Sequence, residues 1–196
     1  MKTSSITLQL LAMSVLTSAA WAQTPAEQDQ QRDVNQQQRI EQGLQSGQLS
    51  TKEAGSLERQ EQHVDNMEAH DLKNGSMSAG EQARLNSAQN KVSSDIYADK
   101  HNGTTGNPNS ASSQRMQSDV QRNVNQQQRI QNGMDNGSLT NREAGSLERG
   151  QGHVNGREAN AAANGHVSAR EQGRIQRSAN RQSGRISRKK HNATTK

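Results

Sequence analysis

The sequence of 196 residues contains no cysteine and no phenylalanine, and it has a single tryptophan and a single tyrosine. The lack of cysteine excludes disulfide bonds and thiol chemistry. Hydrophobic residues make up 27% of the chain and its mean hydropathy is −1.17, so each segment can supply only a few side chains to a core. Without aromatic residues to line it, an apolar substrate pocket of the kind that enzymes commonly use is not expected.

The first 22 residues have the features of a cleavable secretory signal. Lys2 supplies the positive start, an apolar stretch runs from Ile6 to Val15, and Ala20-Trp21-Ala22 places small residues around a cleavage site after Ala22. No second apolar run follows, so we expect no transmembrane segment in the mature chain. These features predict a bacterial protein that is periplasmic or secreted.

The mature chain contains an internal duplication at an offset of 90 residues. Residues 33–102 and 123–192 align without a gap and are identical at 34 of 70 positions. The duplication predicts two units, residues 23–102 and 114–192, followed by a short tail, 193–196. Residues 103–113 are rich in Gly, Ser, Thr and Asn and have no apolar period, which is typical of a flexible linker.

A shorter motif, glycine followed by x-[LMV]-[ST]-x-x-E, occurs twice in each copy, beginning at Gly47, Gly75, Gly137 and Gly165. Glycine can end one helix in the left-handed conformation, and the Ser/Thr and Glu can form a capping box for the next. The motif therefore predicts an all-α fold of two duplicated three-helix units, with short connections between antiparallel neighbours. The predicted helices are Asp29–Gln45, Ser50–Lys73, Ser78–Asp99, Gln114–Asp135, Thr140–Ala163 and Ser168–Lys190.

The middle helix of the second copy is expected to be the weakest. It contains four glycines, Gly145, Gly150, Gly152 and Gly156, and each costs about 1 kcal/mol relative to alanine in a helix interior. We expect this helix to fray, or to gain order on contact with a partner, so that the fold is partly flexible.

The four motifs resemble the second half of an EF-hand calcium loop, because glycine, an apolar residue, Ser/Thr and Glu fall at loop positions 6, 8, 9 and 12. Calcium also needs oxygen ligands at positions 1 and 3. The chain has no carboxylate there: the pairs are Gln42 and Leu44, His70 and Leu72, Asn132 and Met134, and Asn160 and Ala162. Calcium binding at these loops is therefore not expected.

The repeated G-x-[LV]-[ST]-x-x-E segments also make the chain similar to small exported proteobacterial proteins of unknown function. This resemblance covers most of the mature chain and implies no activity.

The two copies differ most in charge. Residues 23–112 hold 8 basic and 13 acidic residues, whereas residues 113–196 hold 15 basic and 6 acidic ones. The basic residues of the last predicted helix recur at steps of three or four, which places them along one face: Arg170, Arg174, Arg177, Arg181, Arg185 and Arg188, followed by Lys189 and Lys190.

This basic helix predicts an interaction protein that contacts a polyanion, such as lipopolysaccharide phosphates, an anionic membrane or extracellular nucleic acid, or an acidic protein surface. Two alternatives are a solvated helix face and a strip that pairs with the acidic first copy, within one chain or by self-association. Specific nucleic-acid recognition is not expected, because no aromatic residues are interleaved with the basic residues to stack on bases.

A metal site is the second functional hypothesis. His63, Met67 and His70 fall at i, i+4 and i+7 in the second predicted helix, a nitrogen and sulfur set that would suit a copper-type periplasmic metal-binding protein. The second copy keeps one of these ligands, His153. Met67 also continues the apolar stripe, so core packing is its other interpretation.

No catalytic arrangement is found in the sequence. Ser56 and Glu58 lie near His63, but the helix supplies no orienting group and no oxyanion site. We therefore expect a protein that is not an enzyme and has no cofactor.

Overall fold

Residues 23–192 are described by a computed structural model, and they form six α-helices and no strand. The all-α prediction is confirmed. The predicted signal, residues 1–22, and the tail, residues 193–196, lie outside the described residues. The helices are α1 (Pro25–Ser46), α2 (Thr51–Asp71), α3 (Ala79–Lys100), α4 (Ala111–Asp135), α5 (Asn141–Ala162) and α6 (Ala169–Lys190), with a short 3₁₀ turn, η1 (Leu72–Asn74), after α2.

The four helices that follow the repeated motif, α2, α3, α5 and α6, begin where it predicts, whereas α1 begins at Pro25 rather than at Asp29. Ser50 caps α2: its hydroxyl accepts from the backbone N–H of Glu53, and the Glu53 carboxylate accepts from the backbone N–H of Ser50 at 2.9 Å. The same capping box begins α3, α5 and α6. Gly47, at the end of α1, has a φ of 75°, the left-handed conformation. The motif therefore marks the end of one helix and the start of the next, and its glutamate forms the capping box of the second helix.

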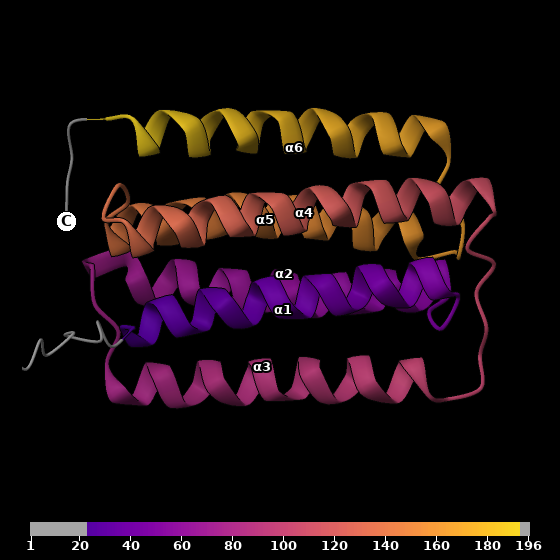
Figure 1. Cartoon of the computed structure of the whole chain (residues 1–196), viewed down its shortest axis with the longest axis horizontal. Coiled ribbons are helices and arrows are strands. Elements are labelled where there is room, and N and C mark those ends of the chain that lie inside the picture. The colour runs from indigo at the N-terminus through magenta and orange to yellow at the C-terminus, as the bar shows by residue number, and fades with distance from the viewer. Residues whose placement is uncertain (1–22, 193–196) are drawn as a thin grey trace, which may run out of the picture.

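The helices lie side by side in four layers (Figure 1). One outer layer is α3, the inner layers are α1 with α2 and α4 with α5, and the other outer layer is α6. The most extensive interface joins α2 to α5, and the next joins α1 to α4. Both join one copy to the other, so the two three-helix units share one core instead of packing separately.

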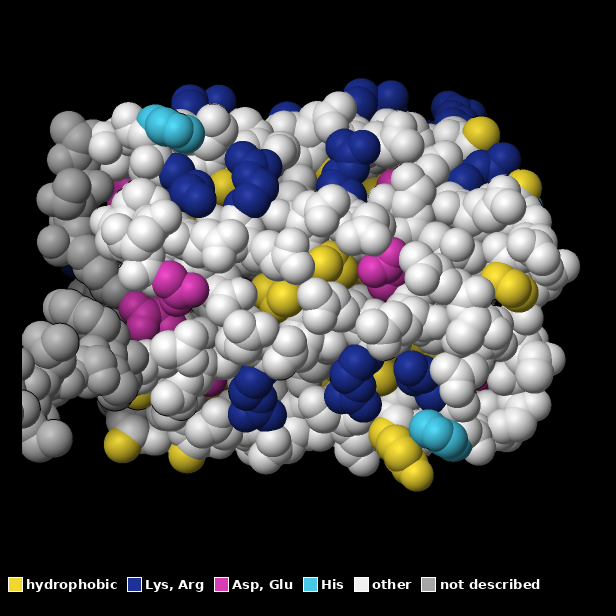
Figure 2. Space-filling view, viewed as in Figure 1, with side chains coloured by type: hydrophobic (Ala, Val, Ile, Leu, Met, Phe, Trp, Pro, Cys, Tyr) yellow, Lys and Arg dark blue, Asp and Glu magenta, His cyan; other side chains and the backbone are white. Residues whose placement is uncertain are grey.

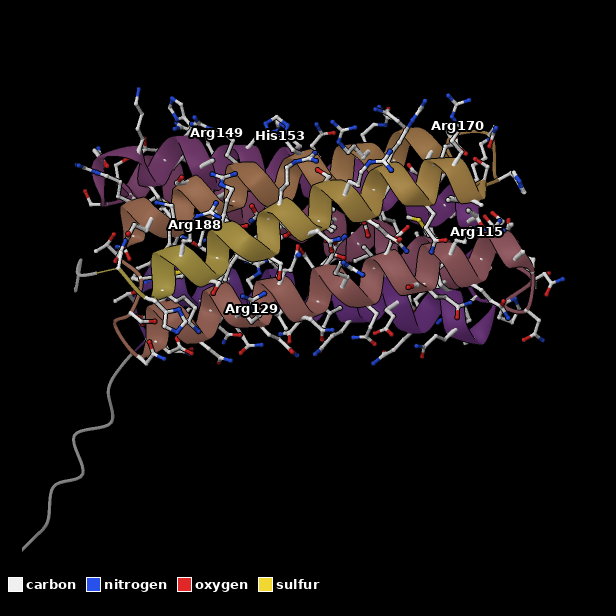
Figure 3. The ribbon with its side chains drawn as sticks, turned by 90° about the horizontal axis from the view of Figure 1, so that it is seen from above. Arg115, Arg129, Arg149, His153, Arg170 and Arg188 are labelled. Carbon is white, nitrogen blue, oxygen red and sulfur yellow. The ribbon has the colours of Figure 1, made fainter. Side chains whose placement is uncertain are left out.

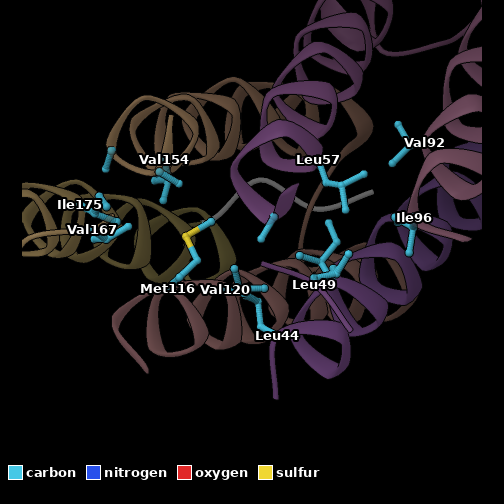
Figure 4. Packing of buried hydrophobic residues seen from close by; sticks show 14 of the residues in the cluster. Leu44, Leu49, Leu57, Val92, Ile96, Met116, Val120, Val154, Val167 and Ile175 are labelled. Atoms are coloured by element: carbon cyan, nitrogen blue, oxygen red, sulfur yellow. The ribbon is translucent and has the colours of Figure 1, made fainter. Parts of the chain in front are cut away.

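The largest apolar cluster draws on both copies (Figure 4). Leu44 and Leu57 from the first copy lie in the same cluster as Met116, Val120 and Val154 from the second. Each helix supplies a thin apolar stripe, and these stripes are covered only when all six helices are assembled.

The connection between the copies is shorter than predicted. Ser110 caps α4 by accepting from the backbone N–H of Ser113 at 3.1 Å, so the helix begins at Ala111 rather than at Gln114. The N–H of Gly106 donates to the carbonyl of Gly47 at 2.8 Å. The predicted linker, residues 103–113, thus contributes its last three residues to α4 and packs at Gly106 against the turn between α1 and α2.

The glycines of α5 do not interrupt the helix, which is continuous from Asn141 to Ala162. They lie where α5 meets its neighbours: a Cβ at Gly145 would come within 2.8 Å of the Leu72 Cβ, and one at Gly152 within 3.2 Å of the Asp65 Cβ. On α2, a Cβ at Gly55 would be 2.5 Å from the Ala162 Cβ. Glycine is needed here because the two helix backbones approach closely.

This close approach predicts opposite effects for two alanine substitutions. Gly55→Ala should lower the melting temperature, because overpacking costs about 1–3 kcal/mol and exceeds the propensity gain. Gly184→Ala, in α6, should raise it slightly, since its Cβ would meet only the flexible end of Arg188 at 3.6 Å. Thermal melts followed by circular dichroism measure both. Equal stabilisation by the two changes would contradict close α2–α5 packing.

None of the helices in residues 23–192 is both long enough and apolar enough to cross a membrane.

Candidate functional site

Acidic and basic side chains occupy different parts of the molecule. Thirteen of the 19 acidic residues are buried, whereas no Lys or Arg in residues 23–192 is buried. Figure 2 shows Lys and Arg side chains along the α6 side of the molecule and others along the α3 side, with the acidic groups of this face between them. The outer surface is therefore more basic than the net charge of +5 indicates.

The predicted basic residues of α6 divide into two groups. Arg170, Arg174, Arg177, Arg181 and Arg188 are exposed. These five arginines, named here the α6 strip, extend over about 27 Å at the helical rise of 1.5 Å per residue. The helix carries one acid, Glu171, and its carboxylate is bound to the cap residue Ser168.

The remaining predicted residues are partly buried, and two of them hold α6 in place. Arg185 donates from Nη2 to the backbone carbonyl of Ser146 in α5 at 2.8 Å, and Lys190 donates to the carbonyl of Arg129 in α4 at 3.2 Å. Lys189 is also partly buried. Arg185 and Lys190 therefore contribute to the attachment of the helix.

Sequence reasoning missed the basic residues that flank α6 (Figure 3). Arg149, His153 and Arg157 are exposed on α5 at steps of four, a spacing that could have identified them. Arg129, on α4, donates to the Ser183 hydroxyl at 2.6 Å and so fixes α6 from its other side. The exposed basic surface therefore spans α5 and α6.

A groove runs between α5 and α6, with a cavity volume of about 330 Å³. Its lining includes His153, Arg157, Arg181 and Arg185. Gly150 opens it, because a side chain there would collide with Gln182 and Arg185. Three cationic side chains and a histidine around one groove favour an anion.

The first copy has the corresponding groove between α2 and α3, with a volume of about 460 Å³. Val64, Met67, Ala88 and Val92 make this groove more apolar than its counterpart. At the same positions, 90 residues on, the second copy has Val154, Arg157, Ser178 and Gln182. The duplication thus provides two grooves of the same architecture, of which one is enriched in arginine.

The predicted metal residues do not line one site. His63 and Met67 lie in the α2–α3 groove, beside Arg59, Arg84 and Lys91, whereas His70 is not among its lining residues. The Nδ1 of His70 is instead 2.9 Å from a carboxylate oxygen of Asp71. The nearby cationic side chains oppose the binding of a metal ion at His63 and Met67.

The buried acids lie in the interior formed by α1, α2, α4 and α5, where side-chain amides donate to them. Gln30 donates to Glu68 at 2.9 Å, and Gln37 donates to Glu58 at 3.1 Å. Burial raises the pKa of Glu58 to about 7 and, together with the nearby Asp33 charge, raises the pKa of Glu148 to about 8. Closed off from solvent, these groups can hold protons or cations but cannot meet a large substrate.

Comparison of the chain with protein-family models, with curated proteins and with solved structures gave no match. Functional inference therefore rests on the residues and geometry described above.

Proposed function

We propose that the protein is an exported, non-catalytic interaction protein that binds the phosphate groups of an anionic envelope surface through the α6 strip and the neighbouring face of α5. The observation that carries this proposal is the α6 strip itself, five exposed arginines on one face with no free acidic side chain on the same helix. Arginine binds phosphate oxygens through two parallel hydrogen bonds, so such a row suits a surface of repeated phosphates.

The distribution of acids favours an external partner over pairing with the first copy. Nine of the thirteen acids in residues 23–112 are buried. At the surface, Glu53 and Glu81 bind their cap residues, and Asp95 pairs with Lys91 at 2.7 Å. Among the described residues, neither of the ion pairs, His70–Asp71 and Lys91–Asp95, includes a residue of α6. The first copy therefore offers little acidic surface to the strip.

Matched substitutions test this proposal. In the first variant Arg170, Arg174, Arg177 and Arg181 are replaced by Gln, which retains helix propensity and leaves Arg185 in place. The control variant replaces four exposed basic residues of the first copy by Gln: Lys52, Arg59, Lys73 and Arg84. Both lose four positive charges, so a difference between them reports position rather than net charge.

Binding should be measured to lipopolysaccharide, to vesicles containing phosphatidylglycerol and to duplex DNA. We expect wild type and control to bind the two envelope surfaces and the α6 variant to lose most of its affinity. Affinity should fall steeply with salt, by roughly 100-fold between about 50 and 200 mM if four contacts behave as they do on a nucleic-acid lattice. Equal losses in both variants, or binding to DNA alone, would contradict an envelope-binding role for α6.

A further inference from the structure

Four carboxyl groups meet in the interior, away from the α6 strip: Asp33 from α1, Asp65 and Glu68 from α2, and Glu148 from α5. Each offers an oxygen, and these four oxygens lie within 4.8 Å of one another. All four side chains are no more than 1% exposed. No Lys or Arg of residues 23–192 is buried with them. The partly buried Arg32 is a single positive charge near Asp33, so four acids lie in the interior without a matching number of cationic side chains.

The amides around this cluster leave some of its oxygens without a partner. Gln127, from α4, donates through Nε2 to Glu148 at 3.1 Å and to Asp65 at 3.4 Å, which places its amide group beside both acids. Its own Oε1 is buried and has no hydrogen-bond partner, as is also true of Asp33 Oδ2 and Glu68 Oε1. An unpartnered buried polar atom is costly, and the four carboxyl side chains of the cluster present only hard oxygen donors.

The duplication supplies an internal comparison. Ninety residues away, Asp33, Asp65 and Glu68 correspond to Asn123, Asn155 and Glu158, and Glu148 corresponds to Glu58. In that second location Asn123 donates to Glu158 at 2.6 Å and to Asn155 at 3.1 Å. An amide donor thus lies between two acceptors there, although Oε1 of Glu58 and Oε1 of Glu158 have no partner. In the cluster, aspartates replace both asparagines. Each accepts an amide hydrogen bond at 2.8 Å, Asp33 from Gln89 and Asp65 from Asn155, but when ionised neither can donate to the neighbouring acids.

We propose that the cluster of Asp33, Asp65, Glu68 and Glu148 binds one hard divalent cation, of which Ca²⁺ fits best. Calcium takes six to eight oxygen ligands at about 2.3–2.6 Å. Oxygens on opposite sides of such an ion are therefore about 4.6–5.2 Å apart, so four carboxyl oxygens that all lie within 4.8 Å of one another are close enough to share one ion. A cation among them replaces repulsion between acids by attraction and satisfies the unpartnered oxygens. This inference does not depend on the surface function of α6.

The test uses the full mature chain, refolded from denaturant because the site is closed in the folded protein. One sample is refolded with about 1 mM CaCl₂, a concentration at which extracellular calcium sites are filled, and another with EDTA. We expect one calcium per chain by elemental analysis after desalting. The melting temperature should be higher with calcium by on the order of 5 °C or more. Parallel samples with Mg²⁺ should show a smaller increase, since Mg²⁺ prefers shorter bonds and keeps its water.

Two variants distinguish a specific site from general binding of cations to acids. Glu148→Gln should abolish the calcium effect, whereas Glu58→Gln, at the equivalent position in the other copy, should retain it. The double change D33N/D65N introduces the asparagines of the second location and should give a folded, calcium-independent protein. The proposal is overturned if wild type retains no stoichiometric calcium, if its melting temperature is the same in calcium and EDTA, or if Glu58→Gln abolishes the effect as fully as Glu148→Gln.

Discussion

Residues 23–103, prepared without the second copy, should lose most of their helical signal and show no cooperative melt. The physical reason is that the largest interface of α2 is with α5. Separation would expose the side chain of Leu72, which packs against Gly145 of α5, together with Asp65, which is buried and accepts a hydrogen bond from Asn155 of α5. The net folding free energy of a protein is only about 5–15 kcal/mol, so the fragment should not stay folded once the main interface is lost. Far-UV circular dichroism of the isolated fragment, at low concentration, measures the effect.

Mixing the two fragments is the complementary experiment. An equimolar mixture of residues 23–103 and 104–192 should regain the helical signal of the full chain, because the connection between α3 and α4 is exposed apart from a few residues. A full chain nicked after Gly103 serves as the control and should stay folded. Since α2 and α5 are related by the duplication, size-exclusion chromatography must exclude a fragment that pairs with a second copy of itself. A monomeric fragment with a cooperative melt would contradict a shared core.

The helices were predictable because their signals are local. Each capping box involves residues three apart, so Ser50, Ser78, Thr140 and Ser168 could be recognised as caps without knowledge of the rest of the fold. The error at the start of α4 arose because its cap, Ser110, lies inside a run of polar residues that also resembles a linker.

The pairing of the copies and the acidic interior could not be predicted in the same way. Glu58, Glu61, Asp65 and Glu68 recur at steps of three and four, which places them on one face of α2. Charged residues on a helix face are ordinarily solvated, and only the position of α5 shows that this face is covered. Likewise, the spacing of Arg185 matches the α6 strip, and its contact with Ser146 depends on where α5 lies.

The interior acids also lead to an unusual dependence of stability on pH, most simply at Glu58 and Glu158. Their carboxyl groups contact each other, with Asp119 nearby, and no described basic side chain is buried with them. Burial raises the pKa of Glu58 from 4.5 to about 7 and that of Glu158 well above 4.5. A folded-state pKa above the unfolded value means that the folded protein holds the proton more tightly. This contribution to stability is fully present below about pH 4.5 and is lost as the pH rises through about 7.

The melting temperature should therefore be higher at pH 5 than at pH 8, by roughly 5–10 °C for a carboxyl group whose pKa is raised from 4.5 to about 7. Glu158→Gln should reduce this difference and stabilise the protein at pH 8, because an amide at position 158 donates to Glu58 without requiring a proton. Glu81→Gln is the control. Hydrogen bonds to Ser78 lower the pKa of Glu81, so its carboxyl group is ionised at both pH values. The difference in melting temperature between pH 5 and pH 8 should therefore persist in this variant. All samples contain EDTA, so that no divalent cation contributes. The prediction is contradicted if wild type is more stable at pH 8 than at pH 5. That result would mean that Glu58 and Glu158 are ionised in the folded protein.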